Sequence, residues 1–248
     1  MKQNTWHINV DMGEGLNNEA SLMPFISACN IACGGHAGDK ETMARVVDLA
    51  LEHQVYIGAH PSFPDREHFG RKTMDLSPKA LSENISQQLT SIINVVMEAK
   101  GTLHHVKPHG ALYNLAAKDE TTAHILIEAI QNSTPNAKLF VPYQSVIFEI
   151  ATSEGIDVMV EAFADRRYHN DLSLVSRSHP KAIILEPEAV FAQLLQMTTQ
   201  RTVTSFENET KEIVADTYCI HGDHPKATSI MKYISTKCNE LGIQIAKA

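Results

Sequence analysis

The side chains that could carry chemistry lie in six short motifs, most of which contain glycine. The motifs are DMGEG (11–15), CGGHAGD (33–39), GAHPSFPDREHFGR (58–71), KPHGALYN (107–114), EAFADRRY (161–168) and HGD (221–223). Carboxylate and imidazole side chains transfer protons near neutral pH, and lysine or arginine stabilises negative charge. Glycine beside them lets the backbone approach a ligand closely. These residue types therefore predict acid–base catalysis on a polar ligand.

One subset of these residues has the composition of a metal site. Asp11, His36 and His60 come from three successive motifs. Two imidazoles and one carboxylate can bind Zn²⁺ or Fe²⁺ and leave a position open for water. The spacing alone leaves the presence of a metal open. The 4 cysteines form no C-x2-C pair, which favours buried thiols over a zinc–thiolate site.

Several well-known catalytic motifs are absent from the sequence. It contains no GxxxxGK[ST] phosphate loop, no HExxH zinc helix and no GxSxG nucleophile turn. His105 and His109 are four residues apart, but Pro108 prevents the continuous helix that a helical metal pair needs. The chain therefore has no recognisable nucleotide-phosphate loop of its own.

Short runs with strand character precede the motifs, and helical patterns follow them. Ser77-Pro78 begins a helix whose apolar residues recur every three or four positions until Gly101, and Asp39, Pro187 and Pro225 begin other helices. The predicted strands are His7–Val10, Ala28–Ala32, Val55–Gly58, His104–Lys107, Lys138–Val141, Asp157–Glu161 and Thr217–Ile220. Strand–helix repeats of this kind give parallel strands joined by right-handed crossovers.

The positions of the motifs favour a barrel over an open sheet. Six of the seven predicted strands end in a polar motif, and ligand sites of parallel α/β folds lie at the carboxyl ends of the strands. Only a closed barrel brings all these ends to one mouth. We therefore predict one (β/α) barrel domain over residues 1–248, with a β-hairpin excursion at 202–216. His104 and His105 alternate on the fourth strand, so one of them points into the barrel.

Length and composition are those of an ordinary globular protein. The 248 residues include 21 Lys and Arg, 29 Asp and Glu and 13 His, and the formal net charge is −8. An acidic balance argues against a nucleic-acid binder, which needs a basic face. No apolar run approaches the roughly 20 residues that cross a bilayer, and the first residues, MKQNTWHINVD, lack the apolar region of a secretory signal. We expect a cytoplasmic protein without nucleic-acid or membrane partners.

The motifs resemble, in order and spacing, those of the LamB/YcsF family. The similarity runs from Asp11 to Asp223, and VKPHGALYN and EAFADRRY are its most specific parts. The resemblance implies an irregular seven-stranded (β/α) barrel, similar to the NodB-like polysaccharide deacetylases. Gly35 stands where the family usually has phenylalanine, which predicts a wider pocket at this position.

The resemblance also implies an activity. The family includes the A subunit of ATP-dependent 5-oxoprolinase, which with B and C subunits opens the lactam ring of 5-oxo-L-proline to give L-glutamate. Because this chain lacks a phosphate loop, we expect ATP to be bound by the partner subunits. Two alternatives remain open: a metal-dependent amide or carbohydrate deacetylase that acts alone, and a lactam-binding subunit without catalytic activity.

The implied chemistry assigns roles to the motif residues. Asp11 or Glu14 would act as general base, and His36, His60 or His109 as proton donor. Lys107 would stabilise an oxyanion or a phosphate. An arginine would hold the substrate carboxylate. The catalytic candidates are Asp11, Glu14, His36, His60, Lys107, His109 and Asp165, and the substrate-binding candidates are Arg71, Asn114, Arg166, Arg167, His221 and Asp223.

Overall fold

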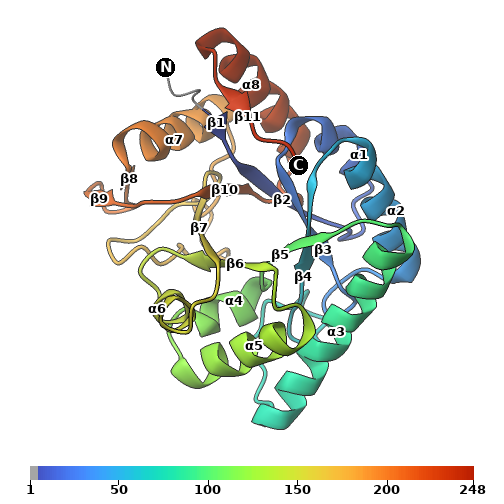
Figure 1. Ribbon diagram of the computed structural model, residues 1–248. Helices are drawn as coiled ribbons and strands as arrows, with labels where there is room; N and C mark the ends of the chain where they lie inside the picture. The colour runs from blue at the N-terminus through green and yellow to red at the C-terminus, as the bar shows by residue number, and fades with distance from the viewer. Residues whose placement is uncertain (1–4) are drawn as a thin grey trace.

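Seven parallel strands close into a barrel at the centre of the molecule (Figure 1). Residues 5–248 are described by a computed structural model. Hydrogen-bonded neighbours around the barrel follow the order β10-β2-β3-β4-β5-β6-β7. The barrel strands are β2 (Ile8–Met12), β3 (Ala28–Ala32), β4 (Tyr56–His60), β5 (Leu103–Val106), β6 (Lys138–Pro142), β7 (Val158–Phe163) and β10 (Thr217–Ile220). The prediction of a closed seven-stranded barrel is confirmed.

Four barrel strands extend further at their carboxyl ends than the sequence predicts: β2, β4, β6 and β7. Pairing with β3 carries β4 past Gly58 to His60, where Ala32 and His60 are partners. Pairing with β10 likewise carries β7 to Phe163, opposite Cys219. Backbone hydrogen bonds to the neighbouring strands therefore determine where β4 and β7 end. The glycine at position 58 does not end β4.

Helices surround the barrel and cover its outer surface (Figure 1). Two begin at the predicted caps: Asp39 Oδ1 accepts a hydrogen bond from Thr42 N, and Ser77 Oγ accepts one from Ala80 N. The last long helix begins at Ala227, two residues after the predicted start at Pro225. The helices are α1 (Glu19–Leu22), the 3₁₀ helix η1 (Met23–Phe25), α2 (Lys40–Glu52), α3 (Pro78–Glu98), α4 (Gly110–Ala116), α5 (Glu120–Ser133), α6 (Val146–Ser153), α7 (Pro187–Gln200) and α8 (Ala227–Leu241).

Two small sheets complete the fold. Strands β8 (Thr202–Thr204) and β9 (Thr210–Glu212) pair antiparallel, where the sequence predicts a hairpin. Strands β1 (Thr5–Trp6) and β11 (Gln244–Ile245) pair in parallel and bring the two ends of the described chain together (Figure 1).

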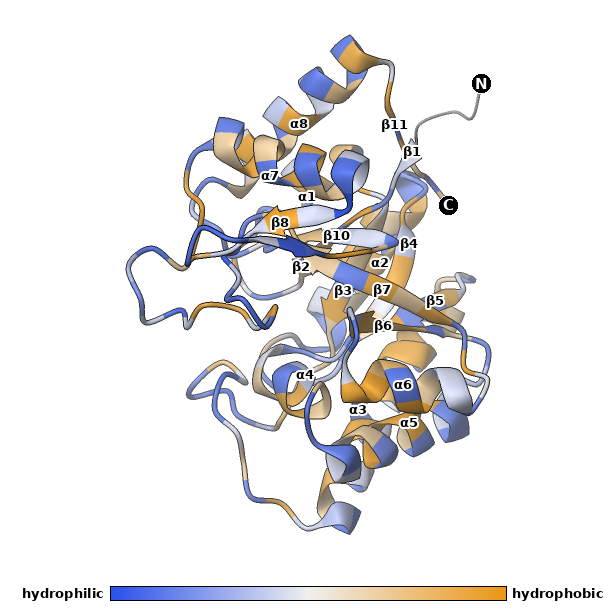
Figure 2. Cartoon of the chain, turned by 90° about the vertical axis from the view of Figure 1, so that its left-hand side faces the viewer, coloured by the Kyte–Doolittle hydropathy of each residue, from blue (hydrophilic) through white to orange (hydrophobic). Residues whose placement is uncertain are grey.

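The helices carry an apolar face and a polar face, and several show both colours along their length (Figure 2). Helix α3, for example, buries Leu81, Ile85, Leu89 and Ile92, which recur every three or four residues. This pattern forms a continuous apolar layer between the helices and the barrel. Within residues 5–248, no helix is both long and apolar enough to cross a membrane.

Candidate active site

Alternate side chains of the strands point into the barrel, and several of these inward residues are polar. Lys107 follows β5, and its Nζ lies 3.0 Å from Asp11 Oδ1 and 3.2 Å from Asn9 Oδ1, both on β2. The same ammonium lies 2.9 Å from Glu161 Oε1 and 3.1 Å from Cys219 Sγ. We call these residues, with Asn30, the inner polar network. It fills the part of the barrel below the mouth, the end at which the strands finish.

This network fixes the charge of Asp11. Burial acts to raise the pKa of Asp11, but Lys107 and nearby histidines, first among them His60, outweigh it and hold that pKa well below its usual range. Burial acts in turn to lower the pKa of Lys107, and Asp11, Cys219 and Glu161 raise it well above its usual range. Asp11 is therefore a carboxylate and Lys107 an ammonium at neutral pH.

A second chain of hydrogen bonds orients the amides beside Asp11. Asn30 Nδ2 donates to Asp11 Oδ1 and to Asn9 Oδ1, each at 2.8 Å, and Asn30 Oδ1 lies 2.7 Å from His105 Nε2. His105 is fully buried, whereas His104 is only partly buried. Of the two histidines that alternate on β5, His105 is thus the one that points into the barrel.

Four titratable side chains meet above this network, and we call them the histidine cluster: Glu14, His36, His60 and His109. The atoms that each could offer to a metal ion all lie within 4.8 Å of one another. Glu14 Oε1 lies 3.0 Å from His36 Nε2, and His60 Nε2 lies 3.0 Å from His109 Nδ1. The rings of His36 and His109 stack in parallel with 3.7 Å between their centroids.

Each member of the histidine cluster comes from a different strand end. Glu14 lies in the β2–α1 loop, His36 in the β3–α2 loop, His60 at the end of β4 and His109 directly before α4. Gly13 and Gly34 precede the first two with φ of 74° and 96°, a conformation that favours glycine. The barrel therefore collects residues from four separate motifs of the chain at one place.

Backbone carbonyl groups fix two of the imidazole rings. His60 Nδ1 lies 2.6 Å from the carbonyl oxygen of Lys107, and His109 Nε2 lies 2.9 Å from that of Phe69. A carbonyl oxygen only accepts, so each of these nitrogens carries the proton. Burial lowers the pKa of His60 well below its usual range and that of His109 to about 4. Both rings are neutral at physiological pH.

The predicted metal triad of Asp11, His36 and His60 needs a correction. Asp11 Oδ1 lies 3.5 Å from His60 Nε2, but it accepts hydrogen bonds from Lys107 and Asn30 and belongs to the inner polar network. Glu14 is the carboxylate that joins the histidines instead. Burial, followed by the charge of Asp11, raises the pKa of Glu14 to about 7.

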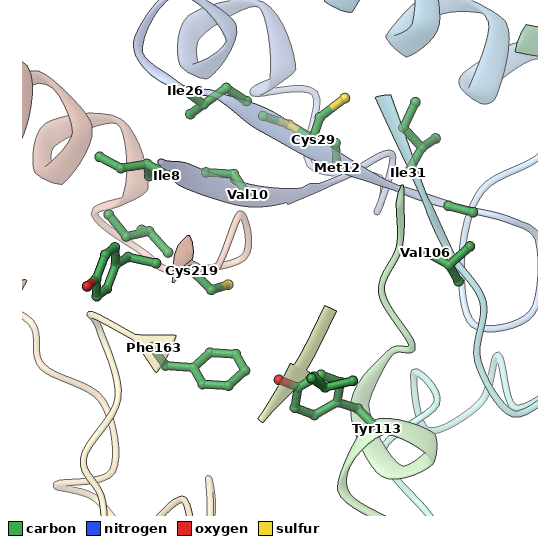
Figure 3. Close-up of a cluster of buried hydrophobic side chains, with 14 of the residues drawn as sticks. Ile8, Val10, Met12, Ile26, Cys29, Ile31, Val106, Tyr113, Phe163 and Cys219 are labelled. Atoms are coloured by element: carbon green, nitrogen blue, oxygen red, sulfur yellow. The ribbon is translucent and has the colours of Figure 1, made fainter. Parts of the chain in front are cut away.

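Beside Asp11, two residues of the mouth form a carboxylate–imidazole pair. His221 Nδ1 lies 3.0 Å from Asp165 Oδ1, and the backbone N–H of His221 donates to Asp165 Oδ2 at 2.9 Å. The His221 ring stacks on Phe163, which in turn points toward Tyr113 (Figure 3). Ligand atoms of Asp11 and His221 lie within 4.8 Å of each other. The pair therefore faces the same space as Asp11.

Two arginines share one carboxylate at the edge of the mouth, and we call this group the arginine rim. Arg71 Nη2 donates to Asp223 Oδ2, and Arg177 Nη1 donates to the same oxygen at 2.9 Å. The side chains of Arg71 and Arg177 are 40% and 27% exposed. Two cations with one anion leave a net positive charge, which suits an anionic ligand.

Three other predicted substrate-binding residues, Asn114, Arg166 and Arg167, are not part of the arginine rim. Arg166 is buried and donates to the carbonyl of Val175 within its own loop. Arg167 is partly buried and Asn114 is exposed on α4. Within residues 5–248, neither side chain forms a hydrogen bond or ion pair with the histidine cluster or the arginine rim. Of the predicted arginines, Arg71 is thus the one that belongs to the arginine rim.

Several residues of the site are not among the predicted catalytic and substrate-binding residues. Asn9 and Asn30 are polar positions inside apolar strands, and Asn9 is two residues from Asp11, so the strand period could have found it. Glu161 and Cys219 likewise lie on strands whose alternate residues face inward. Arg177 carried no such signal, because it lies in the long loop between β7 and α7.

The sequence predicts a wider pocket at Gly35, and this prediction is wrong. A Cβ at this position would overlap Ser62 Oγ and Gln88 Oε1. Gln88 is itself held by Ser62, whose backbone N–H donates to Gln88 Oε1 at 3.0 Å. The space of a side chain at position 35 is therefore already filled by Gln88.

The sequence and the fold of this chain match those of known proteins. Residues 6–248 match the model of the LamB/YcsF family. The chain belongs to the LamB/YcsF family. A similar solved structure is a lactam utilization protein from Thermus thermophilus, with 32% identity and a TM-score of 0.91 over 98% of this chain and 100% of the other. LamB/YcsF membership thus rests on nearly the whole described chain.

More distant structures share the barrel of this LamB/YcsF chain. A putative cellobiose-phosphate cleavage protein from Enterococcus faecalis is 11% identical, with a TM-score of 0.60 over 99% of this chain and 98% of that one. A family 4 carbohydrate esterase from Streptomyces lividans is 9% identical, with a TM-score of 0.52 over 98% and 91%. At these identities the likeness concerns the fold alone, and it confirms the predicted relation to deacetylase-type barrels.

Proposed function

We propose that this chain is the ring-opening subunit of an ATP-dependent 5-oxoprolinase, which converts 5-oxo-L-proline to L-glutamate. The observation that carries the proposal is the arrangement of Asp11, the Asp165–His221 pair and the arginine rim around one mouth. A base, an acid and a site for a carboxylate are what hydrolysis of an anionic lactam requires. The lactam utilization protein from Thermus thermophilus supports the substrate class.

Asp11 is the general base in this proposal. It is 5% exposed and held as a carboxylate by Lys107, so it can accept a proton from a water molecule. Lys107 was expected to stabilise an oxyanion directly. Because its ammonium is buried and already contacts Asp11 and Glu161, we assign it the role of holding Asp11 ionised.

His221 is the proton donor. His60 and His109 donate their single protons to backbone carbonyl groups, which makes both poor acids for the substrate nitrogen. Asp165 accepts from His221 Nδ1 and stabilises the protonated ring that can deliver a proton from Nε2. The arginine rim, Arg71 and Arg177, holds the substrate carboxylate.

In this proposal, ATP and the partner subunits activate the lactam for attack by water. A lactam is a stable amide, and transfer of the γ-phosphoryl group of ATP to its oxygen gives ADP and an activated imidate. Water adds to the ring carbon, the C–N bond breaks with protonation of nitrogen, and γ-glutamyl phosphate results. A second water gives glutamate and phosphate. We place the phosphoryl transfer on the B and C subunits, because this sequence has no phosphate loop.

The test is an assay of glutamate formation from 5-oxoproline by the chain alone and with its B and C partners, each with and without ATP. Only the complete complex with ATP should turn over. Asp11→Asn should lower kcat/KM by about 10²- to 10⁴-fold, whereas Glu240→Gln, an exposed change on α8, should leave it unchanged.

Two results would contradict the proposal. Glutamate formation by the lone chain without ATP would remove the need for partners. Normal turnover by Asp11→Asn in an assembled complex would remove the assigned base and would favour a binding subunit without catalytic activity. Release of acetate from an acetylated sugar by the lone chain would favour the deacetylase alternative.

A further inference from the structure

The protons of the histidine cluster leave two lone pairs facing each other. His60 Nδ1 and His109 Nε2 each donate to a backbone carbonyl, so in the neutral rings His60 Nε2 and His109 Nδ1 are bare acceptors. These two nitrogens are 3.0 Å apart. Two lone pairs at hydrogen-bond distance repel each other unless a proton or another cation lies between them.

A shared proton is a poor solution at this place. The rings of His60 and His109 are 1% and 8% exposed, and burial opposes a positive charge on either imidazole. Glu14 Oε1 also approaches His109 Nδ1 to 3.5 Å, so the ionised carboxylate adds a third acceptor atom beside the two bare nitrogens. With Glu14 ionised, three acceptor atoms of the cluster therefore lie together with no proton between them.

His36 adds a third imidazole, and within residues 5–248 no backbone carbonyl is a hydrogen-bond partner of its ring. Its Nε2 lies 3.0 Å from Glu14 Oε1, and its Nδ1 is buried without a hydrogen-bond partner. Buried polar atoms normally have partners. With the proton of His36 on Nδ1, the four side chains, all buried or nearly so, present nitrogen and oxygen lone pairs to a common space.

We propose that Glu14, His36, His60 and His109 bind one divalent transition-metal ion, with Zn²⁺ as the ion best matched to three imidazoles and one carboxylate. Zinc bonds of about 2.0–2.1 Å in a tetrahedron separate the ligand atoms by about 3.4 Å. The observed separations of 3.0 and 3.5 Å lie on either side of that value.

The backbone carbonyl groups act as the outer partners of this site. Metal-binding histidines usually donate their other ring N–H to a carbonyl or carboxylate, which fixes the tautomer and the ring orientation. Lys107 O and Phe69 O do this for His60 and His109. A bound ion would act as a Lewis acid beside Asp11. The inference does not depend on the identity of the amide substrate.

The experiment measures metal binding directly, on the full chain purified without a polyhistidine tag and stripped with a chelator. Zn²⁺ and Co²⁺ are titrated separately, and the readouts are calorimetry, the visible absorption of Co²⁺ and the melting temperature. We expect one ion per chain, Co²⁺ absorption bands of a nitrogen-rich site of low coordination number, and a raised melting temperature.

Two variants remove one ligand atom each and keep the structural hydrogen bond of the ring. In His60→Asn, the amide nitrogen replaces Nδ1 and can still donate to Lys107 O. In His109→Gln, the amide nitrogen replaces Nε2 and can still donate to Phe69 O. Each should weaken binding at least about 100-fold. The control His7→Asn, a histidine outside the histidine cluster that bonds Thr217, should bind as the unaltered protein does.

Failure of the metal site and failure of the proposed function are distinguishable, because no readout here uses turnover. Absence of binding by the unaltered chain at millimolar metal would overturn the inference. Equal affinity in the unaltered chain, His60→Asn and His109→Gln would also overturn it, since the ion would then lie elsewhere. Melting in the absence of metal verifies that each variant is folded.

Discussion

Lys107 Nζ lies 3.0 Å from Asp11 Oδ1 and 2.9 Å from Glu161 Oε1, so one buried ammonium serves two buried carboxyl groups. Lys107→Met should cost about 3–5 kcal/mol of the free energy of unfolding, because it leaves a buried charge without its partner. Urea denaturation measures this cost. Lys107→Met with Glu161→Gln should recover part of the stability and none of the activity. Unchanged stability of Lys107→Met would refute the assigned role.

Gly58 permits the inward position of His105. A Cβ at position 58 would overlap the imidazole of His105, whose Nε2 lies 2.7 Å from Asn30 Oδ1. Gly58→Ala should therefore cost about 1–3 kcal/mol of unfolding free energy through overpacking. The same change in a His105→Ala background should cost much less, because the ring is gone. Equal costs in both backgrounds, measured by urea denaturation, would contradict this explanation.

Acid should destabilise the fold through His7. Burial, with His104 and Lys138, lowers the pKa of His7 to about 4 from 6.5, and its Nε2 is buried without a partner. The unfolded chain then binds more protons, so the contribution is complete above pH 6.5 and is lost as the pH falls toward 4. At about 1.4 kcal/mol per pKa unit, it amounts to at most about 3 kcal/mol.

The measurement is the free energy of unfolding between about pH 7 and pH 4.5, the window in which His7 titrates in the unfolded chain but not in the folded one. His7→Asn places an oxygen at the position of Nδ1 and can keep the hydrogen bond of 2.8 Å to Thr217 Oγ1. It should show a shallower loss of stability with acid than the unaltered protein does. The same slope in both proteins would show that His7 does not contribute.

Arg177 should contribute to substrate binding. It shares Asp223 with Arg71 at the rim, and a charge-assisted hydrogen bond to a carboxylate is worth about 1.5–3 kcal/mol. Arg177→Ala should therefore raise KM for 5-oxoproline by about 10- to 100-fold and change kcat little. Steady-state kinetics of the complete complex measure both. A lower kcat with unaltered KM would instead place Arg177 at the chemical step.

Asp165 should act through His221. The carboxylate orients the ring by accepting from Nδ1 at 3.0 Å, so Asp165→Asn and His221→Ala should each lower kcat by about 10²-fold or more. The double variant should be hardly worse than His221→Ala, because residues that act as a unit are not additive. Multiplied losses in the double variant would indicate two independent roles.

The sequence predicted much of this protein from local patterns. The helices are predicted by the helical period, the cap at Asp39 and the start at Ser77-Pro78. The polar motifs after successive strands indicate a barrel with one mouth. The same motifs indicate the LamB/YcsF family. These signals are local, because a strand or helix start depends on neighbouring residues.

Which side chains meet at the mouth was decided only by the tertiary structure. The sequence placed Asp11 with His36 and His60, but closure of the barrel pairs Asp11 with Lys107, 96 positions away, and brings Glu14 to the histidines. Arg177 reaches Asp223 from a long loop without any pattern of its own. Strand periodicity gives the face of a residue, whereas the direction of a loop side chain depends on contacts from distant segments.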